Sequence, residues 1–378
     1  MALAIFLGAN LASLAQVTTE RPPSAGDQPE NPGPLATNLS PALRSKDIRA
    51  AMRKVADWQL PRIVDTPSQD WTFATLYDGL LAASQTLGDP RYAQEVQSVA
   101  EHYHWQLGPR QTHADDQAIG KAYLELYRRS HDAAQIASIR KQFDEVMQIP
   151  DQPGKPVWWW CDALFMAPPV WAGLAGVTGD ARYTSYMNRE WAITQALLYD
   201  PKAHLFFRDA NYLHKTEKNG QKVFWSRGNG WVMGGLVRVL TVLPENDPTR
   251  QRYLSLFRDM AAEVVSIQSA DGLWRPGLLD AQDYPLPEVS GSAFFAYAIA
   301  WGVNHGVLDA HTYKPVVTKA WKGMLQHIYE DGRLGCIQPI GEAPGHYKPG
   351  SSYVFGTGAF LMAASEIDAM STGRHHPH

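Results

Sequence analysis

Asp162 is the residue of this sequence best suited to acid–base chemistry. It follows three consecutive tryptophans and a cysteine and precedes a long apolar run. A carboxyl group among aromatic rings loses hydration, which raises its pKa and suits it to act as a general acid. The alternative is structural, because an aspartate at the start of a helix can accept hydrogen bonds from the first backbone amides. The local sequence leaves both interpretations open.

A second acidic position, the adjacent pair Asp115 and Asp116, also stands at the expected start of a helix. Consecutive helical residues point in different directions, so we expect one of the two to face a site and the other to cap the helix. Pairs of carboxyl groups are typical of enzymes that cleave glycosidic bonds. Together with Asp162, this pair therefore indicates carbohydrate chemistry.

The segment 225–231 places a cation and an amide between two tryptophans. Arg227 offers a bidentate partner for a carboxylate, and Asn229 offers an amide. Trp225 and Trp231 offer flat faces on which a sugar ring can pack. The alternative is a helix-entry turn with a structural arginine, but the flanking tryptophans favour a binding role.

Further polar and aromatic residues stand where other apolar runs begin, and we expect substrate contacts from Trp160, Ser290 and Ser292. A few polar groups among aromatic side chains are typical of small-ligand sites. These residues are far apart in the sequence, so the elements that carry them must bring them together.

Internal repetition predicts those elements. The segment Gly88-Asp89-Pro90-Arg91-Tyr92 recurs as Gly179-Asp180-Ala181-Arg182-Tyr183, each time after an apolar run and before a new helix. Apolar runs of the same kind cover 71–84, 115–127, 161–175, 228–243, 290–306 and 355–370. A helix that is apolar nearly all round is buried. More polar, amphipathic segments such as 133–147 and 249–269 follow the first five runs.

Six buried helices that alternate with outer helices predict an all-α (α/α)6 toroid. The inner helices of such a ring point the same way, so the segments before them share one mouth. We expect a single catalytic domain over 45–372, with the helix 47–60 as the outer partner of the last inner helix. Two short strand-like segments, 205–208 and 222–225, predict a small hairpin in a loop at this mouth.

The N-terminal segment 1–15 is short and apolar and ends in small side chains, like a secretory signal without its basic start. We expect export to the periplasm, or a cytoplasmic protein if this segment is not a functional signal. Residues 16–44 are rich in Pro, Gly, Ser and Thr and are expected to form a flexible leader.

Charge and cysteine content narrow the possible partners. The chain has 34 Lys and Arg against 38 Asp and Glu, a net charge of −4, which argues against nucleic acid or an anionic membrane as a partner. Two cysteines, Cys161 and Cys336, exclude a disulfide scaffold and a cysteine-rich zinc site but leave one disulfide open. The histidines have no metal-ligand spacing, so we expect no metal and no cofactor. We expect a monomer or a weak dimer.

Four motifs in order resemble glycoside hydrolase family 105, the unsaturated rhamnogalacturonyl hydrolases. They are WCDALFMAPP at 160–169, WSRGNGW at 225–231, PEVSGSAFF at 287–295 and YVFGTGAF at 353–360. The resemblance covers about residues 45 to 370 and implies an (α/α)6 fold. It also implies that the substrate is an oligosaccharide with a 4,5-unsaturated uronic acid at its non-reducing end, as polysaccharide lyases produce.

The resemblance implies hydration of the enol ether: an aspartate protonates C4, water adds at C5, and the hemiketal opens and releases the next sugar. Asp162 matches the acid/base of the family. The second acidic position falls within the pair, where we expect Asp115 to act in catalysis and Asp116 to contact substrate. Arg227 and its flanking tryptophans match the uronate-binding loop. Several relatives carry a histidine in the strand-like segment where this chain has Arg208. We expect Arg208 to contact substrate there, with subsite contacts that differ from those of the relatives.

Three other readings compete with this one. The first is a sister family that acts on unsaturated glucuronyl ends. The second is a ring that binds uronides without turnover, against which Asp162 and Arg227 argue. The third is an inverting glucanase-type hydrolase, which needs a glutamate acid at the mouth, and Glu288 is the candidate.

Overall fold

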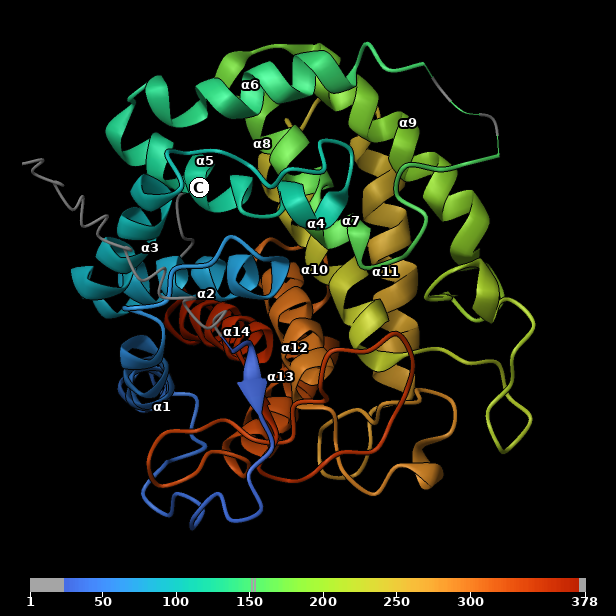
Figure 1. The fold of residues 1–378 in the computed structure, drawn as a ribbon. Helices are drawn as coiled ribbons and strands as arrows, with labels where there is room; N and C mark the ends of the chain where they lie inside the picture. Colours follow the sequence, from blue (N-terminus) through green and yellow to red (C-terminus); the bar gives the residue numbers. More distant parts are fainter. Residues whose placement is uncertain (1–23, 151, 153, 374–378) are drawn as a thin grey trace, which may run out of the picture.

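The computed structural model describes residues 24–150, 152 and 154–373, and they form a double ring of helices (Figure 1). The inner ring contains α2 (Trp71–Leu87), α4 (Ala114–Gln117) with α5 (Gly120–Ser130), α7 (Ala163–Met166) with α8 (Pro168–Thr178), α10 (Ser226–Val242), α12 (Val289–Asn304) and α14 (Val354–Thr372). Each inner position contacts the next, and α14 contacts α2, which closes the ring. The predicted (α/α)6 toroid is confirmed.

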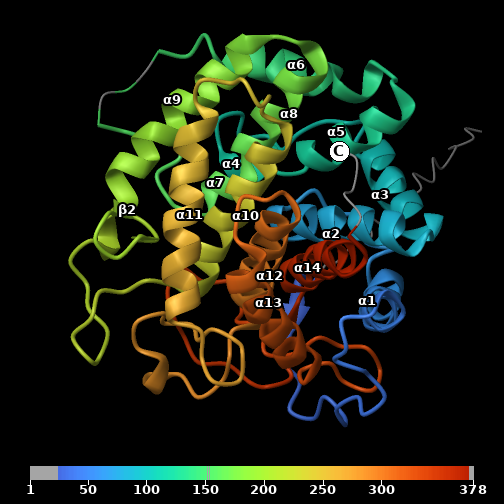
Figure 2. The ribbon, with the colours of Figure 1, turned by 180° about the vertical axis from the view of Figure 1, so that it is seen from behind.

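The outer ring contains α1 (Ser45–Gln59), α3 (Pro90–His102), α6 (Ala134–Val146), α9 (Ala181–Leu198), α11 (Arg250–Ser266) and α13 (Ala310–Leu325). Each packs on an inner helix, and α1 packs on α14 as the sequence predicts. Helices α9 and α11 lie side by side in both views (Figures 1 and 2), joined by a hydrogen bond of 2.7 Å from the Tyr253 hydroxyl to Asn188.

The repeated Gly-Asp-x-Arg-Tyr segments join an inner helix to the next outer one. Gly88 ends α2 in the left-handed conformation, with φ of 65°, and the Asp89 side chain accepts from the backbone amide of Arg91 at the start of α3. One turn later the Tyr92 hydroxyl donates to Asp57 of α1 at 2.7 Å. The second copy does the same, and Tyr183 of α9 donates to Asp144 of α6 at 3.0 Å. The motif therefore caps one helix and ties two outer neighbours.

Strands are few and short among the described residues. Strand β2 (Tyr199–Asp200) pairs with β3 (Leu205–Phe206), and β1 (Gly26–Asp27) pairs with β4 (Ser352–Tyr353). The predicted pairing of 205–208 with 222–225 is wrong. The second segment instead makes single bridges, from Lys222 to Thr216 and from Trp225 to Gly277, because the intervening loop folds back on itself. Three short 3-10 turns, η1 (Leu60–Arg62), η2 (Ala210–Tyr212) and η3 (Ala281–Asp283), lie in connecting segments.

The expectation of a flexible leader over 16–44 does not hold for the part that the structure describes, residues 24–44. There β1 pairs with the strand that enters α14, and the Ala36 amide donates to the Ile328 carbonyl at 2.8 Å. These backbone bonds fasten the segment to the ring. The expected signal segment, 1–15, and residues 16–23 lie outside the described residues. No helix in the described part of the chain could cross a membrane.

Candidate active site

Asp162 and Asp115 come from neighbouring inner positions and meet at the end of the ring where the inner helices begin. Asp162 precedes α7 and Asp115 lies in α4, and these two short helices contact one another. Electrostatic repulsion from Asp162 is one of the two main reasons why Asp115 resists ionisation. The two carboxyl groups therefore act on each other across the mouth.

Burial raises the pKa of both carboxyl groups, so that each keeps its proton at a higher pH than a carboxyl group in water does. The Asp162 side chain is buried, and the loss of hydration raises its pKa against the opposing pull of Arg208 and Arg227. Burial, followed by repulsion from Asp162, raises the pKa of Asp115 to about 7. Asp162 makes no capping hydrogen bond to the helix that follows, so its structural alternative fails. Two protonatable carboxyl groups in one place can supply a proton to a substrate.

Asp116 has a different environment from Asp115. Its carboxylate accepts from the Arg110 backbone amide at 2.7 Å and from the guanidinium of the same residue. It therefore holds the loop before α4 and does not cap the helix. The cap comes from His113, whose Nδ1 accepts from the Asp115 amide at 3.3 Å and whose ring lies 4.9 Å from that of Trp160.

Arg227 is buried in the protein, whereas a residue that binds substrate needs accessible donor atoms. Its side chain is 1% exposed, and its two terminal nitrogens donate at 2.7 Å to the carbonyls of Gln338 and Pro339. Its guanidinium lies between the rings of Trp225 and Phe355, at 4.4 and 4.8 Å. The guanidinium therefore fastens the loop 338–347 over the ring.

The other predicted binding residues of this region are also buried, and two of them, Trp225 and Asn229, form hydrogen bonds within the protein. Trp225 donates to the Gln338 side chain at 2.9 Å, and Asn229 exchanges hydrogen bonds with the Phe206 backbone. Trp231 packs against the aromatic side chains of the core. These residues have no free surface for a ligand, and they set the positions of the loops around Asp162.

Ser290 and Ser292 serve the start of α12. The Ser290 hydroxyl donates to Glu288, and the Ser292 hydroxyl accepts from the Trp274 amide at 3.0 Å. Glu288 caps α12, accepting from the Gly291 amide at 2.6 Å and from the Gln338 amide at 3.0 Å. Its full burial and these bonds leave it no role as a glucanase-type acid.

Two residues near Arg208 with exposed side chains, Trp159 and Glu342, were not among the predicted substrate contacts. Trp159 is 44% exposed beside Trp160, and its ring lies 5.3 Å from the guanidinium of Arg208. Glu342 reaches Arg208 from the loop 338–347, at 3.7 Å. The run of three tryptophans pointed to Trp159, whereas nothing near Glu342 in the sequence marks it.

Cys161 touches the catalytic candidate directly, and its Sγ donates to Asp162 Oδ1 at 3.2 Å. Cys161 and Cys336 are both free and buried, so the disulfide that the sequence left open is absent. No cluster of three or more His, Cys, Asp or Glu within the described ranges could hold a metal ion.

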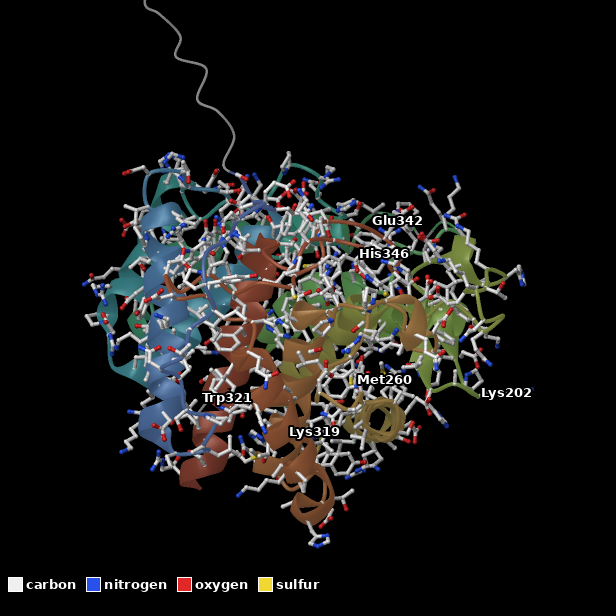
Figure 3. The ribbon with its side chains drawn as sticks, turned by 90° about the horizontal axis from the view of Figure 1, so that it is seen from below. Lys202, Met260, Lys319, Trp321, Glu342 and His346 are labelled. Atoms are coloured by element: carbon white, nitrogen blue, oxygen red, sulfur yellow. The ribbon has the colours of Figure 1, made fainter. Side chains whose placement is uncertain are left out.

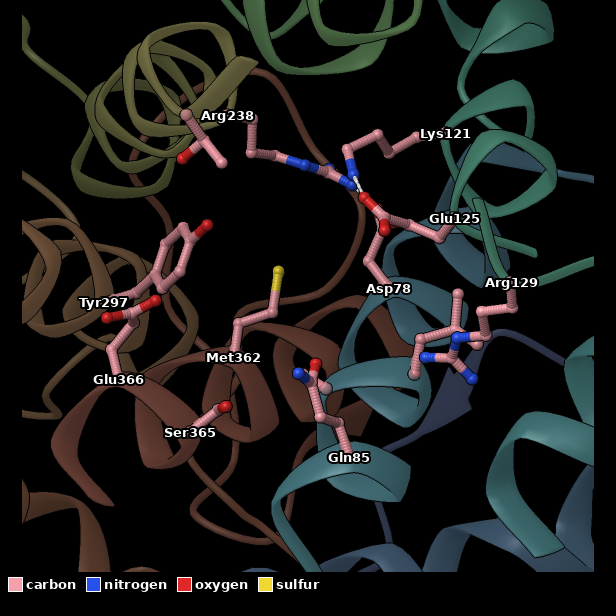
Figure 4. A pocket seen from close by; sticks show the side chains of 13 residues that line it. Asp78, Gln85, Lys121, Glu125, Arg129, Arg238, Tyr297, Met362, Ser365 and Glu366 are labelled. Carbon is pink, nitrogen blue, oxygen red and sulfur yellow. Dashed lines mark hydrogen bonds and ion pairs between the residues drawn. The ribbon is translucent and has the colours of Figure 1, made fainter. Parts of the chain in front are cut away.

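A polar cavity of about 130 Å³ lies within the ring among the later turns of the inner helices, away from Asp162 (Figure 4). Four of its charged residues form ion pairs, whereas the buried Glu366 carboxyl accepts from the Asn304 side chain at 2.7 Å and burial raises its pKa to about 7. Asp78 pairs with Arg238, with both side chains 6% exposed, and Glu125 pairs with Lys121 and Arg128. The paired side chains of Asp78, Arg238, Lys121 and Glu125 line the cavity.

Residues 45–371 match the model of Glycosyl Hydrolase Family 88. An unsaturated 3S-rhamnoglycuronyl hydrolase of Formosa agariphila is 40% identical, covering 86% of this chain and 91% of that protein. A hydrolase of the same name from an Alteromonas species is 31% identical, over 97% and 96%. A solved family 88 structure from Bacteroides vulgatus is 29% identical with a TM-score of 0.82, over 86% and 99%.

These matches confirm the resemblance to hydrolases of unsaturated uronides, and they make the chain a glycoside hydrolase. The family match extends from the first outer helix to the last inner one and so includes the whole double ring. This chain belongs to glycosyl hydrolase family 88.

Proposed function

We propose that this hydrolase removes the 4,5-unsaturated uronic acid from the non-reducing end of oligosaccharides made by polysaccharide lyases. The observation that carries the proposal is the pair Asp162 and Asp115, two carboxyl groups at the mouth whose pKa values are both raised by burial. Protonating an alkene carbon requires an acid that still holds its proton at working pH, and burial of this kind supplies one.

In the proposed reaction, Asp162 gives its proton to C4 of the unsaturated ring, and positive charge develops at C5. A water molecule forms the new C–O bond at C5 and loses a proton to the carboxylate that has formed. The resulting hemiketal opens, and the next sugar leaves as a free alcohol. Asp115, which interacts with Asp162, holds the water or exchanges the proton in this reaction.

We propose rhamnoglycuronyl oligosaccharides as the substrate class in preference to rhamnogalacturonyl ones. Support comes from the names of the two relatives that match most of the chain at 40% and 31% identity. A relative named as an unsaturated rhamnogalacturonyl hydrolase, from Bacillus subtilis, is 27% identical over 47% of this chain.

Loss of ultraviolet absorbance of the conjugated enol acid tests this function directly. We expect the wild-type protein to bleach an unsaturated rhamnoglycuronyl disaccharide faster than an unsaturated rhamnogalacturonyl one. Asp162→Asn should lower kcat by about a hundred- to ten-thousandfold, because general acid catalysis is lost. Asp259→Asn, a change of the same kind on the exposed face of α11, should retain activity. Persistent absorbance with every unsaturated uronide would reject the proposal.

A further inference from the structure

The buried state of Arg227 leaves the substrate carboxylate without its expected partner. Both terminal nitrogens of that guanidinium donate to backbone carbonyls, and two aromatic rings cover its faces. A carboxylate could reach it only if the loop 338–347 lifted away. A uronic acid in contact with Asp162 needs a cation that is already accessible.

Arg208 is such a cation. Its side chain is 15% exposed, and its backbone carbonyl accepts from the Cys161 amide at 2.8 Å, which fixes it next to Asp162. Among the described residues its ion pairs run through one terminal nitrogen, Nη1, to Asp209 at 2.5 Å and to Glu342 at 3.7 Å. Nε has no partner there but is buried, so it is not open to a ligand. Nη2 makes no hydrogen bond within the described part of the chain, and it is the donor that remains for a further carboxylate.

The surroundings of Arg208 suit a charged sugar ring. Trp159 presents an exposed indole 5.3 Å from the guanidinium, and it packs against Trp160 at 4.7 Å. Aromatic faces pack on sugar rings, and a charge-assisted hydrogen bond from an arginine to a carboxylate is stronger than one between neutral groups. Asp209 pairs with Arg208 from a buried position, with a side chain that is 2% exposed, so a ligand does not displace Asp209.

Glu342 occupies the exposed side of the same guanidinium. Its side chain is 66% exposed and lies on the loop 338–347 (labelled in Figure 3). A carboxylate held at 3.7 Å from a largely exposed position is held weakly. A substrate carboxylate, which brings a packed sugar ring with it, can replace it.

We infer that Arg208 binds the carboxylate of the unsaturated uronic acid, and that Glu342 pairs with Arg208 until the substrate displaces it. The inference rests on the proposed function and adds the residue that selects an acidic sugar. Another cation near the mouth, Arg110, is less suited, because Nε and Nη2 of its guanidinium both bind Asp116.

The test compares the unsaturated disaccharide with its methyl ester, which is similar in shape but uncharged. KM and kcat are measured for both substrates in the wild type and in Arg208→Gln, Arg208→Lys and Glu342→Gln. Arg208→Gln should raise KM for the acid by about ten- to a hundredfold, the loss expected for a charged hydrogen bond, and leave KM for the ester nearly unchanged. Arg208→Lys should restore part of the preference for the acid.

Glu342→Gln should lower KM for the acid by about two- to fivefold, because an internal competitor is removed. Glu245→Gln, the same change in an exposed loop after α10, controls for the altered net charge. An Arg208→Gln enzyme that keeps the wild-type ratio between acid and ester would overturn the inference. So would a Glu342→Gln enzyme with unchanged KM, a measurement that stands even if Arg208→Gln fails to fold. Failure of the wild type on both substrates would instead reject the proposed function.

Discussion

Asp115 makes the stability of the folded ring depend on pH. Burial and the neighbouring Asp162 raise its pKa to about 7, above its ordinary value of 3.8. The folded state therefore binds this proton more tightly than the unfolded chain does. The associated stability is complete below pH 4 and is lost as the pH rises towards 7.

Replacing this carboxyl should remove that dependence. We expect Asp115→Asn to raise Tm relative to the wild type at pH 8 but not at pH 4, because the amide never ionises. Thermal unfolding at the two pH values checks this, with Asp259→Asn as the control. An equal effect at both pH values would show that Asp115 ionises as freely as it does in water.

Cys161 affects the pKa of the second carboxyl group, Asp162, through one weak hydrogen bond. Its thiol donates to Asp162 Oδ1 at 3.2 Å, and a donor favours the ionised form, which opposes the rise in the pKa of Asp162. Cys161→Ala should therefore raise the pKa of Asp162 and move the alkaline fall of kcat/KM to higher pH. Cys161→Ser keeps a donor and should stay close to the wild-type profile. A profile that is the same in all three proteins would assign the thiol a packing role alone.

At the scale of elements, α2 and α14 approach so closely that only glycine fits between them. A Cβ on Gly358 would lie 2.2 Å from the carbonyl oxygen of Thr75, and one on Gly79 would lie 2.5 Å from that of Gly358. Gly358→Ala must therefore push two inner helices apart. We expect a loss of about 1–3 kcal/mol of unfolding free energy.

Gly176 provides the matched control, since it lies in α8 and a methyl group added to its Cα would have no neighbour within 4 Å. Gly176→Ala should gain about 0.5–1 kcal/mol, because alanine loses less backbone entropy in a helix. Urea unfolding of both variants measures the difference. A loss in Gly176→Ala as large as that in Gly358→Ala would mean that helix contact is not the cause.

The helices could be predicted because the residues that start, end and bury them lie within or next to them in the sequence. The Gly-Asp-x-Arg-Tyr repeat contains its own helix stop and helix start, and the apolar runs between copies report burial directly. The pairing of 222–225 was not predictable in this way. Trp225 pairs with Gly277 on a distant loop, whereas the nearness of 222–225 to 205–208 in the sequence favoured a local hairpin.

At the scale of the whole molecule, the site residues whose surroundings are close in the sequence were predicted correctly, and those whose surroundings are distant were not. The motifs pointed to Asp162, whose tryptophans stand beside it in the chain, and its burial raises its pKa as expected. Arg227 looked equally suitable, but its partners Gln338 and Pro339 lie 111 and 112 positions further along. No local pattern reveals that the loop before α14 covers this arginine.

Closure of the ring by its last helix has a consequence for how the protein is made. Helix α14 packs against α1, α2 and α12, and it is apolar on nearly every side. Until α14 has left the ribosome, the growing polypeptide exposes to the cell the apolar sides of α1, α2 and α12 that α14 later covers. Proteins whose distant parts must meet fold slowly and aggregate easily. Yield in the cell should therefore depend on how quickly α14 is synthesised after α12 and on the chaperones present at that moment.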